Sequence, residues 1–251
     1  MERITSRKNA YIARLRLLAG SASARRESGE TVLDGVKLLS EAKASGAEIT
    51  GVLFDESGEA TDVHGCPMYA APAELVAYAS PVKNSPGPVF SVRMPRIARP
   101  DKLTTAIVLE NMQDPGNVGT LIRTANALGI DAVILAGDCA DRTSPRAVRA
   151  SMGAAFRQYV VECPLGELPA LLRGFGLKLY GAALSPVAVD IRTVALKNAA
   201  VAIGNEGHGL SRELLDMCDG AVIIPMRPGS ESLNAAAAGA VAMWEMARGK
   251  L

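Results

Sequence analysis

The sequence predicts an α/β protein with a mainly parallel sheet, preceded by a smaller α/β module. From Ala106 onward, short apolar runs alternate with amphipathic segments, as expected when strands are buried on both faces. Prolines gather between Ser80 and Lys102, where they interrupt helices and disfavour central strands. A chain of 251 residues is also long enough to bury two cores. We therefore expect one domain over 1–98 and a second over 103–251.

In the first domain a helix is expected around Asn9–Leu18. A strand near Thr31, a helix at Val36–Leu39 and a strand at Ile49–Phe54 follow. Basic side chains crowd residues 1–26, where Glu2 is the only acid: Arg3, Arg7, Lys8, Arg14, Arg16, Arg25 and Arg26. Such a cluster is either a solvated helix face or a patch that follows nucleic-acid phosphates.

The second domain is expected to contain five buried strands: Ala106–Leu109, Ala132–Leu135, Leu177–Ala182, Ala200–Ile203 and Ala221–Ile224. After the first strand, apolar residues recur at helical spacing from Val118 to Leu128, and Gly129 is placed to end that helix. The last helix, Leu233–Arg248, carries Trp244, which we expect in the core or at a subunit interface.

Composition excludes several kinds of protein. Four cysteines lie far apart and there are only two histidines, so we expect reduced thiols and no metal site. A net charge of +1 argues against a protein that binds nucleic acid with its whole surface. No apolar run is long enough for a membrane span or a signal peptide, which predicts a cytoplasmic protein with no membrane partner.

Three loops that follow predicted strands carry polar side chains together with glycine or proline. The first holds Asn117, which is either a helix N-cap or a site residue, and leads to Arg123. The helix dipole does not favour an arginine so early in a helix. The second loop holds Glu206 and His208, and a surface role is favoured for His208. The third holds Ser232 and Asn234, which are both good N-cap residues. Because the carboxyl ends of parallel strands share one edge, the three loops predict one site.

The same loops, in the same order, resemble the three motifs of the SpoU-type ribose methyltransferases of the SPOUT superfamily. The matching stretches are N-V-G-T-L-I-R-T-A, I-G-N-E-G-H-G-L and I-P-M…S-L-N, and R-A-S-M-G-A-A-F-R also resembles the family. The likeness covers 103–251. In the first domain, T-V-L-D-G-V-K-L-L-S-E-A is similar to a small ribosomal-protein-like RNA-binding domain often fused to this catalytic domain.

The resemblance implies a C-terminal trefoil knot, a homodimer with sites beside the subunit interface, and S-adenosylmethionine as cofactor. It places the cofactor on Gly204, Ile224 and Leu233. It places catalysis and substrate contacts on Asn117, Arg123, Glu206, Ser232 and Asn234. With the basic cluster, it suggests that Arg7, Lys8, Arg14 and Arg16 bind RNA.

The implied reaction is methylation of a ribose 2′-hydroxyl in structured RNA, with ribosomal RNA favoured over transfer RNA by the extra basic domain. Arg123 would either take the hydroxyl proton or clamp a phosphate, with Glu206 orienting it, and both roles stay open here. One alternative is a non-catalytic RNA-binding protein on the knotted scaffold. A Rossmann-type nucleotide enzyme is a further alternative, disfavoured because G-x-G-x-x-G is missing.

Overall fold

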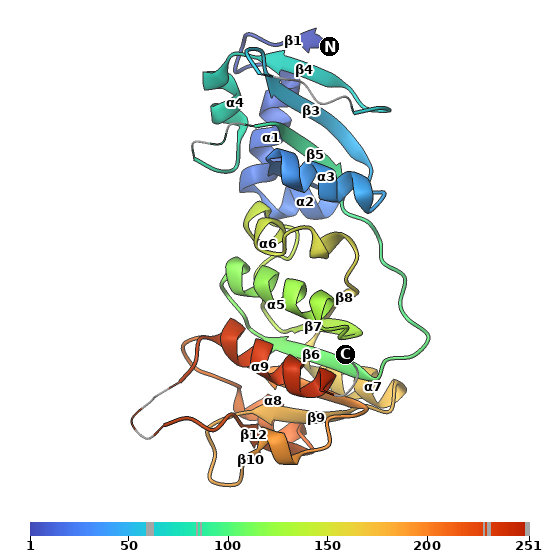
Figure 1. Cartoon of the computed structure of the whole chain (residues 1–251), viewed down its shortest axis with the longest axis vertical. Coiled ribbons are helices and arrows are strands. Elements are labelled where there is room, and N and C mark those ends of the chain that lie inside the picture. Colours follow the sequence, from blue (N-terminus) through green and yellow to red (C-terminus); the bar gives the residue numbers. More distant parts are fainter. Residues whose placement is uncertain (59–62, 84, 86, 228, 230–231, 249–251) are drawn as a thin grey trace. The chain divides into compact units, whose positions relative to one another are not determined.

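The computed structural model describes residues 1–58, 63–83, 85, 87–227, 229 and 232–248 (Figure 1). Its contacts divide the chain into two compact units. Unit 1 comprises Met1–Arg96 and Asp141–Arg157, and unit 2 comprises Ile97–Ala140 and Gln158–Leu251. Asp141–Arg157 therefore packs in unit 1, whereas the sequence predicts that this segment belongs to a second domain over 103–251.

Unit 1 is built on a five-stranded mixed sheet. In spatial order its strands are β1 (Glu2–Arg3), β4 (Met68–Ala71), β3 (Ile49–Asp55), β5 (Val89–Arg93) and β2 (Glu30–Asp34). Strand β5 is antiparallel to both of its neighbours and lies inside the sheet. This central strand was not predicted, because prolines were expected to exclude one here. Pro88 is the residue directly before β5, so no proline lies within the hydrogen-bond ladder of the strand.

Helices α1 (Ala10–Gly20) and α4 (Ala73–Ala79) contact each other and share one apolar core with the sheet. The expected helix near Asn9 and strands near Thr31 and Ile49 are present. Helices α2 (Ala22–Ser28), α3 (Val36–Ala44) and α6 (Pro145–Ala150) complete the unit, each in contact with β2.

Three ion pairs join Asp141–Arg157 to the rest of unit 1. Arg149 contacts Asp34 at 3.0 Å, Arg157 contacts Glu41 at 2.9 Å, and the buried Arg25 contacts Asp141 at 2.8 Å. These pairs link residues more than a hundred positions apart, so no local sequence pattern indicates them.

Unit 2 contains the mainly parallel sheet that the sequence predicts. In spatial order its strands are β10 (Val189–Asp190), β12 (Gly220–Ile223), β9 (Lys178–Ala182), β11 (Ala199–Ile203), β6 (Thr105–Glu110), β7 (Ala132–Ala136) and β8 (Val160–Cys163), and all pairings are parallel. The five expected strands are confirmed, whereas β8 and β10 were not predicted.

Helices cover this sheet on both faces. Helices α7 (Leu168–Gly174) and α8 (Arg212–Met217) share one apolar core with it. Helices α5 (Pro115–Ala127) and α9 (Ala235–Ala247) pack side by side against its central strands (Figure 1). A Cβ on Gly239 would lie 2.3 Å from Leu121 Cδ2, so glycine permits the close approach of α5 and α9. No helix in the described ranges combines the length and apolar character needed to cross a membrane.

Candidate active site

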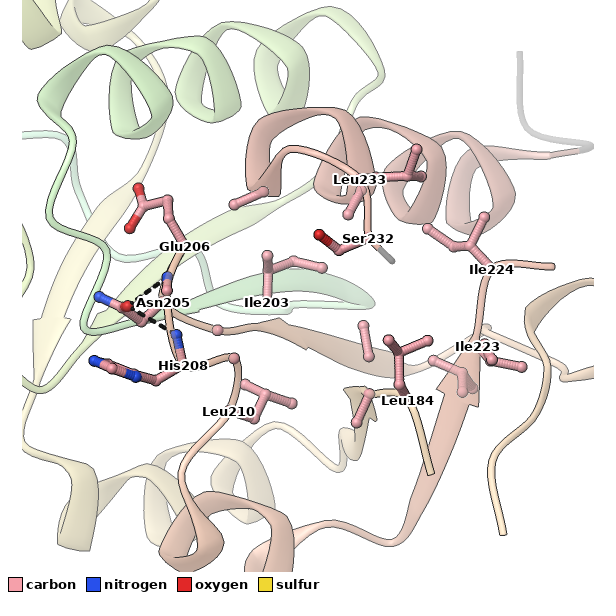
Figure 2. Close-up of a pocket in the computed structure, with 18 of the residues that line it drawn as sticks. Leu184, Ile203, Asn205, Glu206, His208, Leu210, Ile223, Ile224, Ser232 and Leu233 are labelled. Atoms are coloured by element: carbon pink, nitrogen blue, oxygen red, sulfur yellow. Dashed lines mark hydrogen bonds between the residues drawn. The ribbon is translucent and has the colours of Figure 1, made fainter. Parts of the chain in front are cut away.

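A pocket of about 440 Å³ opens at the carboxyl ends of β9, β11 and β12 (Figure 2). Its apolar walls include Leu184, Ile203, Leu210, Ile224 and Leu233. Figure 2 shows Glu206 and His208 at one end of the pocket and Ile224 and Leu233 at the other. A largely apolar pocket with a few polar groups at this edge of a parallel sheet is typical of a small-molecule site.

The loop after β11 is closed on itself. Asn205 and Gly209 exchange two backbone hydrogen bonds, of 3.0 and 2.9 Å, and the Asn205 Oδ1 accepts hydrogen bonds from the amides of Gly207 and His208. A Cβ on Gly204 would lie 2.1 Å from the carbonyl carbon of Gly209, closer than any side chain permits. Glycine at 204 therefore lets the loop fold back and expose its backbone to the pocket.

Glu206 connects this loop to the start of helix α5. Its carboxylate accepts hydrogen bonds from the Asn117 side chain at 2.9 Å and from the amides of Gln113 and Asp114 at 3.4 and 3.3 Å. Desolvation alone would raise the pKa of Glu206, but these hydrogen bonds outweigh it and hold the pKa below its ordinary value. A negative charge at the N-terminus of α5 is also favoured by the helix dipole.

Asn117 does not cap α5. Asp114 is the N-cap, and its side chain accepts a hydrogen bond from the Gly116 amide at 2.5 Å. The capping interpretation of Asn117 is therefore wrong. Because Asn117 lies inside the first turn, its side-chain amide is available to Glu206.

The two polar residues of the third loop have different roles. Asn234 caps α9, since its side-chain oxygen accepts hydrogen bonds from the amides of Ala236 and Ala237. Ser232 makes no cap and lines the pocket with Leu233. The pocket thus brings together Gly204, Glu206, Ile224, Ser232 and Leu233, with Asn117 attached through Glu206.

Arg123 lies elsewhere. It is exposed on α5 and lines an open groove between α5 and α9, together with Leu128, Val241 and Trp244. The hypothesis that Glu206 orients Arg123 is not met within one chain, because Glu206 bonds to the start of α5 instead. Trp244 is 56% exposed in the single chain, which excludes the core role that the sequence left open.

Sequence reasoning missed three residues that hold the pocket loops together: Asn111, Gln113 and Asn205. The Asn205 amide donates to the Asn111 carbonyl at 2.8 Å, and the Gln113 amide donates to the Asp138 carbonyl at 2.5 Å. All three lie in the polar loops already singled out, directly after β6 and β11. The sequence places these residues in the polar loops, but it does not show which loops contact each other.

The predicted RNA-binding residues of unit 1 have three different surroundings. Arg14 forms an ion pair with Glu30, which is 2% exposed and also binds Arg93. The Arg7 and Arg16 guanidinium groups instead lie over the Tyr78 ring, while Lys8 is exposed. Across the described part of the chain, no three His, Cys, Asp or Glu side chains gather as a metal site.

The pocket fits an adenine-containing methyl donor. Its volume is in the range of small-molecule sites, and its walls near Ile224 and Leu233 are apolar, as an adenine ring requires. The absent side chain at Gly204 leaves room for backbone groups to approach a ligand closely.

Comparison with known proteins agrees with this geometry. Residues 104–244 match the model of the SpoU rRNA Methylase family. The chain is 30% identical to the 23S rRNA (guanosine(2553)-2′-O)-methyltransferase RlmP of Bacillus subtilis, covering 98% of this chain and 99% of that protein. It is 31% identical to the 23S rRNA (uridine(2479)-2′-O)-methyltransferase of Streptomyces viridochromogenes, covering 99% and 93%.

Among solved structures, the AdoMet-bound rRNA methyltransferase from Sinorhizobium meliloti superposes with a TM-score of 0.87 at 26% identity, covering 100% of this chain and 98% of that chain. The family match spans the sheet and loops that build the pocket, and the relatives extend over nearly the whole chain. The chain therefore belongs to the SpoU rRNA Methylase family.

Proposed function

We propose that this protein transfers a methyl group from S-adenosylmethionine to a ribose 2′-hydroxyl of ribosomal RNA. The observation that carries the proposal is the pocket in which the Gly204 loop and the Glu206 carboxylate meet the start of α5. Relatives from Bacillus subtilis and Streptomyces viridochromogenes, whose names state this reaction on 23S rRNA, support it.

Gly204, Ile224 and Leu233 would hold the cofactor, which supplies an electrophilic methyl group on sulfur. The backbone around Gly204 offers hydrogen-bonding groups, because no side chain covers it. Ile224 and Leu233 offer apolar surface at the other end of the pocket. These are the three positions at which the family resemblance places the cofactor.

The polar residues would position the ribose and accept the proton that its hydroxyl loses on methylation. Ser232 in the pocket can hydrogen-bond a ribose hydroxyl, and the Glu206 carboxylate, fixed by Asn117 at the pocket end, can accept that proton directly or through water. Asn234 would act by fixing the loop before α9 through its cap. A guanidinium remains protonated in proteins, so Arg123 would bind the neighbouring phosphate and stabilise negative charge that develops on the oxygen.

We also propose a homodimer formed through the α5–α9 groove. Trp244 and Val241 present apolar surface there, 56% and 37% exposed, beside Arg123. A second copy would cover this surface, and aromatic residues of this kind are enriched at interface centres. Because Arg123 is outside its own pocket, the dimer would let it serve the pocket of the partner. Mixing Arg123→Ala with Glu206→Ala protomers should then restore activity that neither variant has alone.

A trefoil knot in the C-terminal segment completes the proposal. Strand β12 lies outside β9, whereas α9 returns to contact β6 and β11, so the chain crosses back over the sheet between them. The SpoU resemblance supports threading of this segment through a loop. If it is threaded, fusing a large folded protein to the C-terminus should slow the first folding of newly translated chains strongly, and an unchanged folding rate of such chains would contradict the knot.

The reaction is tested with labelled S-adenosylmethionine and protein-free ribosomal or transfer RNA from cells that lack this protein. Label in ribosomal RNA alone is expected. Label in transfer RNA alone would contradict the substrate assignment. Cofactor binding with no transfer to either RNA would favour a non-catalytic RNA-binding protein.

A further inference from the structure

Two arginines of unit 1 lie over one exposed tyrosine. The guanidinium carbon of Arg7 is 4.6 Å, and that of Arg16 5.2 Å, from the centroid of the Tyr78 ring. Arg7 precedes α1, Arg16 lies on α1 and Tyr78 lies on α4, so the contact between these helices assembles the cluster. All three side chains are exposed, and that of Tyr78 is 38% exposed.

These two arginines differ from most others in unit 1. Neither Arg7 nor Arg16 forms an ion pair with a described residue, whereas carboxylates pair with Arg3, Arg14, Arg25, Arg93, Arg149 and Arg157. Two like charges above one ring repel each other, and the negative face of the aromatic ring offsets part of that repulsion. The cluster therefore concentrates positive charge that no carboxylate of the described residues pairs with.

We propose that Arg7, Arg16 and Tyr78 form a grip for the phosphodiester backbone of the RNA substrate. This inference rests on the proposed function, because it assigns where the same RNA is held. A guanidinium that lies over a ring keeps its N–H groups for hydrogen bonding, and two N–H groups of one guanidinium can bind a phosphate bidentately, so each arginine can hold one phosphate. The ring limits the motion of both side chains, so less conformational entropy is lost when RNA binds.

The grip differs from the patch expected from sequence. Arg14 is excluded from it because Glu30 neutralises its charge. Tyr78 is added, although it carries no charge and was not predicted. The assignment is thus specific enough to test with a substitution that leaves the net charge unchanged.

The experiment measures binding of the full-length protein to protein-free ribosomal RNA by filter retention, between about 50 and 200 mM salt. Tyr78→Leu keeps apolar bulk but removes the ring, and we expect affinity to fall about five-fold. Tyr78→Phe keeps the ring and should bind like the wild type. The double variant Arg7→Ala/Arg16→Ala should lower the magnitude of the salt slope by about 1.4 to 1.8, at roughly 0.7 to 0.9 per phosphate.

A matched control is Arg26→Ala/Lys37→Ala, which removes two exposed positive charges elsewhere in unit 1. The control should change the slope much less. Equal losses in the two double variants, or wild-type binding by Tyr78→Leu with an unchanged melting temperature, would overturn the proposal. Loss of binding by Tyr78→Phe would also overturn it, because the aromatic ring is retained.

The outcome is separable from that of the proposed function. In methyl transfer, Tyr78→Leu should raise the KM for RNA with little change in kcat, since the pocket lies in unit 2. If the wild type bound RNA through Tyr78 but transferred no methyl group, the proposed reaction would fail while the grip stood. If transfer occurred with a KM independent of Tyr78, the grip would fail while the reaction stood.

Discussion

The Asn205 side chain and the Asn111 backbone tie the two main loops of the pocket together through a hydrogen bond of 2.8 Å. Asn111 has a φ of 49°, a left-handed conformation that asparagine tolerates better than most residues. Its own side-chain oxygen accepts a hydrogen bond from the Asp138 amide at 2.8 Å. Asn205 also accepts the amides of Gly207 and His208, so one side chain orders its own loop and anchors it to the next.

Replacing Asn205 with alanine should therefore loosen the pocket without removing a reacting group. Loss of these hydrogen bonds should destabilise the protein by roughly 1–2 kcal/mol and raise the Kd for S-adenosylmethionine about ten-fold. Titration calorimetry measures the affinity. Asn126→Ala is the matched control, because its amide bonds to Gln158 away from the pocket. Equal cofactor affinity in the two variants would contradict the positioning role.

Gly204→Ala should abolish cofactor binding. The new Cβ would stand 2.1 Å from the Gly209 carbonyl carbon, so the loop has to open by more than ordinary relaxation permits. Gly207→Ala is the control, since its nearest neighbour would be 3.5 Å away and its φ lies outside the left-handed region. A Gly204→Ala protein that binds the cofactor normally would show that the close approach at this loop is dispensable.

The ionisation of Glu206 should make the pocket sensitive to acid. Hydrogen bonds hold its folded-state pKa below the ordinary value of 4.5, so the charged form stabilises the fold above that pH. This stabilisation is lost as the pH falls below 4.5 and through the folded-state pKa. The hydrogen-exchange protection factors of the amides of Gln113 and Asp114, corrected for the slower intrinsic exchange at low pH, should fall in that window. Glu206→Gln should remove the pH dependence, and an unchanged profile in that variant would refute the assignment.

Trp244→Glu should separate the protomers. A charge at the centre of the α5–α9 groove removes a large apolar contact, and burying it in the interface is unfavourable. We expect the dimer dissociation constant to rise at least about 30-fold, measured by analytical ultracentrifugation. Leu17→Glu, at a residue 57% exposed in unit 1, should leave the assembly unchanged. A wild type that is monomeric at every concentration would contradict the proposed dimer.

Much of the fold follows from apolar periodicity alone. Strands β6, β7 and β11 are buried along their whole length, so their sequences are almost continuously apolar and easy to recognise. Strand β8 was missed because Glu162 interrupts a short run, and β10 because it has only two residues. Helix α2 was not predicted, because its sequence is polar. Its buried residue is Arg25, which forms an ion pair with Asp141, far away in the sequence.

The candidate site was predictable in its loops but not in its pairings. Sequence order indicates that Asn117 and Glu206 share one edge of the sheet, because both follow parallel strands. Sequence order does not indicate that Glu206 accepts a hydrogen bond from Asn117, or that Arg123 faces a separate groove. Both depend on the residue at which α5 begins, because that residue sets the direction in which each side chain of the helix points. Likewise Glu2 is the only acid within residues 1–26, which hold the basic cluster, whereas folding brings Glu30 to Arg14.

The proposed methyl acceptor is a ribose 2′-hydroxyl, and alkaline hydrolysis of ribosomal RNA labelled by the wild-type protein tests this, with Arg123→Ala as the inactive control. A 2′-O-methyl group blocks cleavage at its own phosphodiester, so the label should run as alkali-stable dinucleotides and be absent with Arg123→Ala. Label recovered in mononucleotides would place the methyl group on a base and exclude ribose methylation.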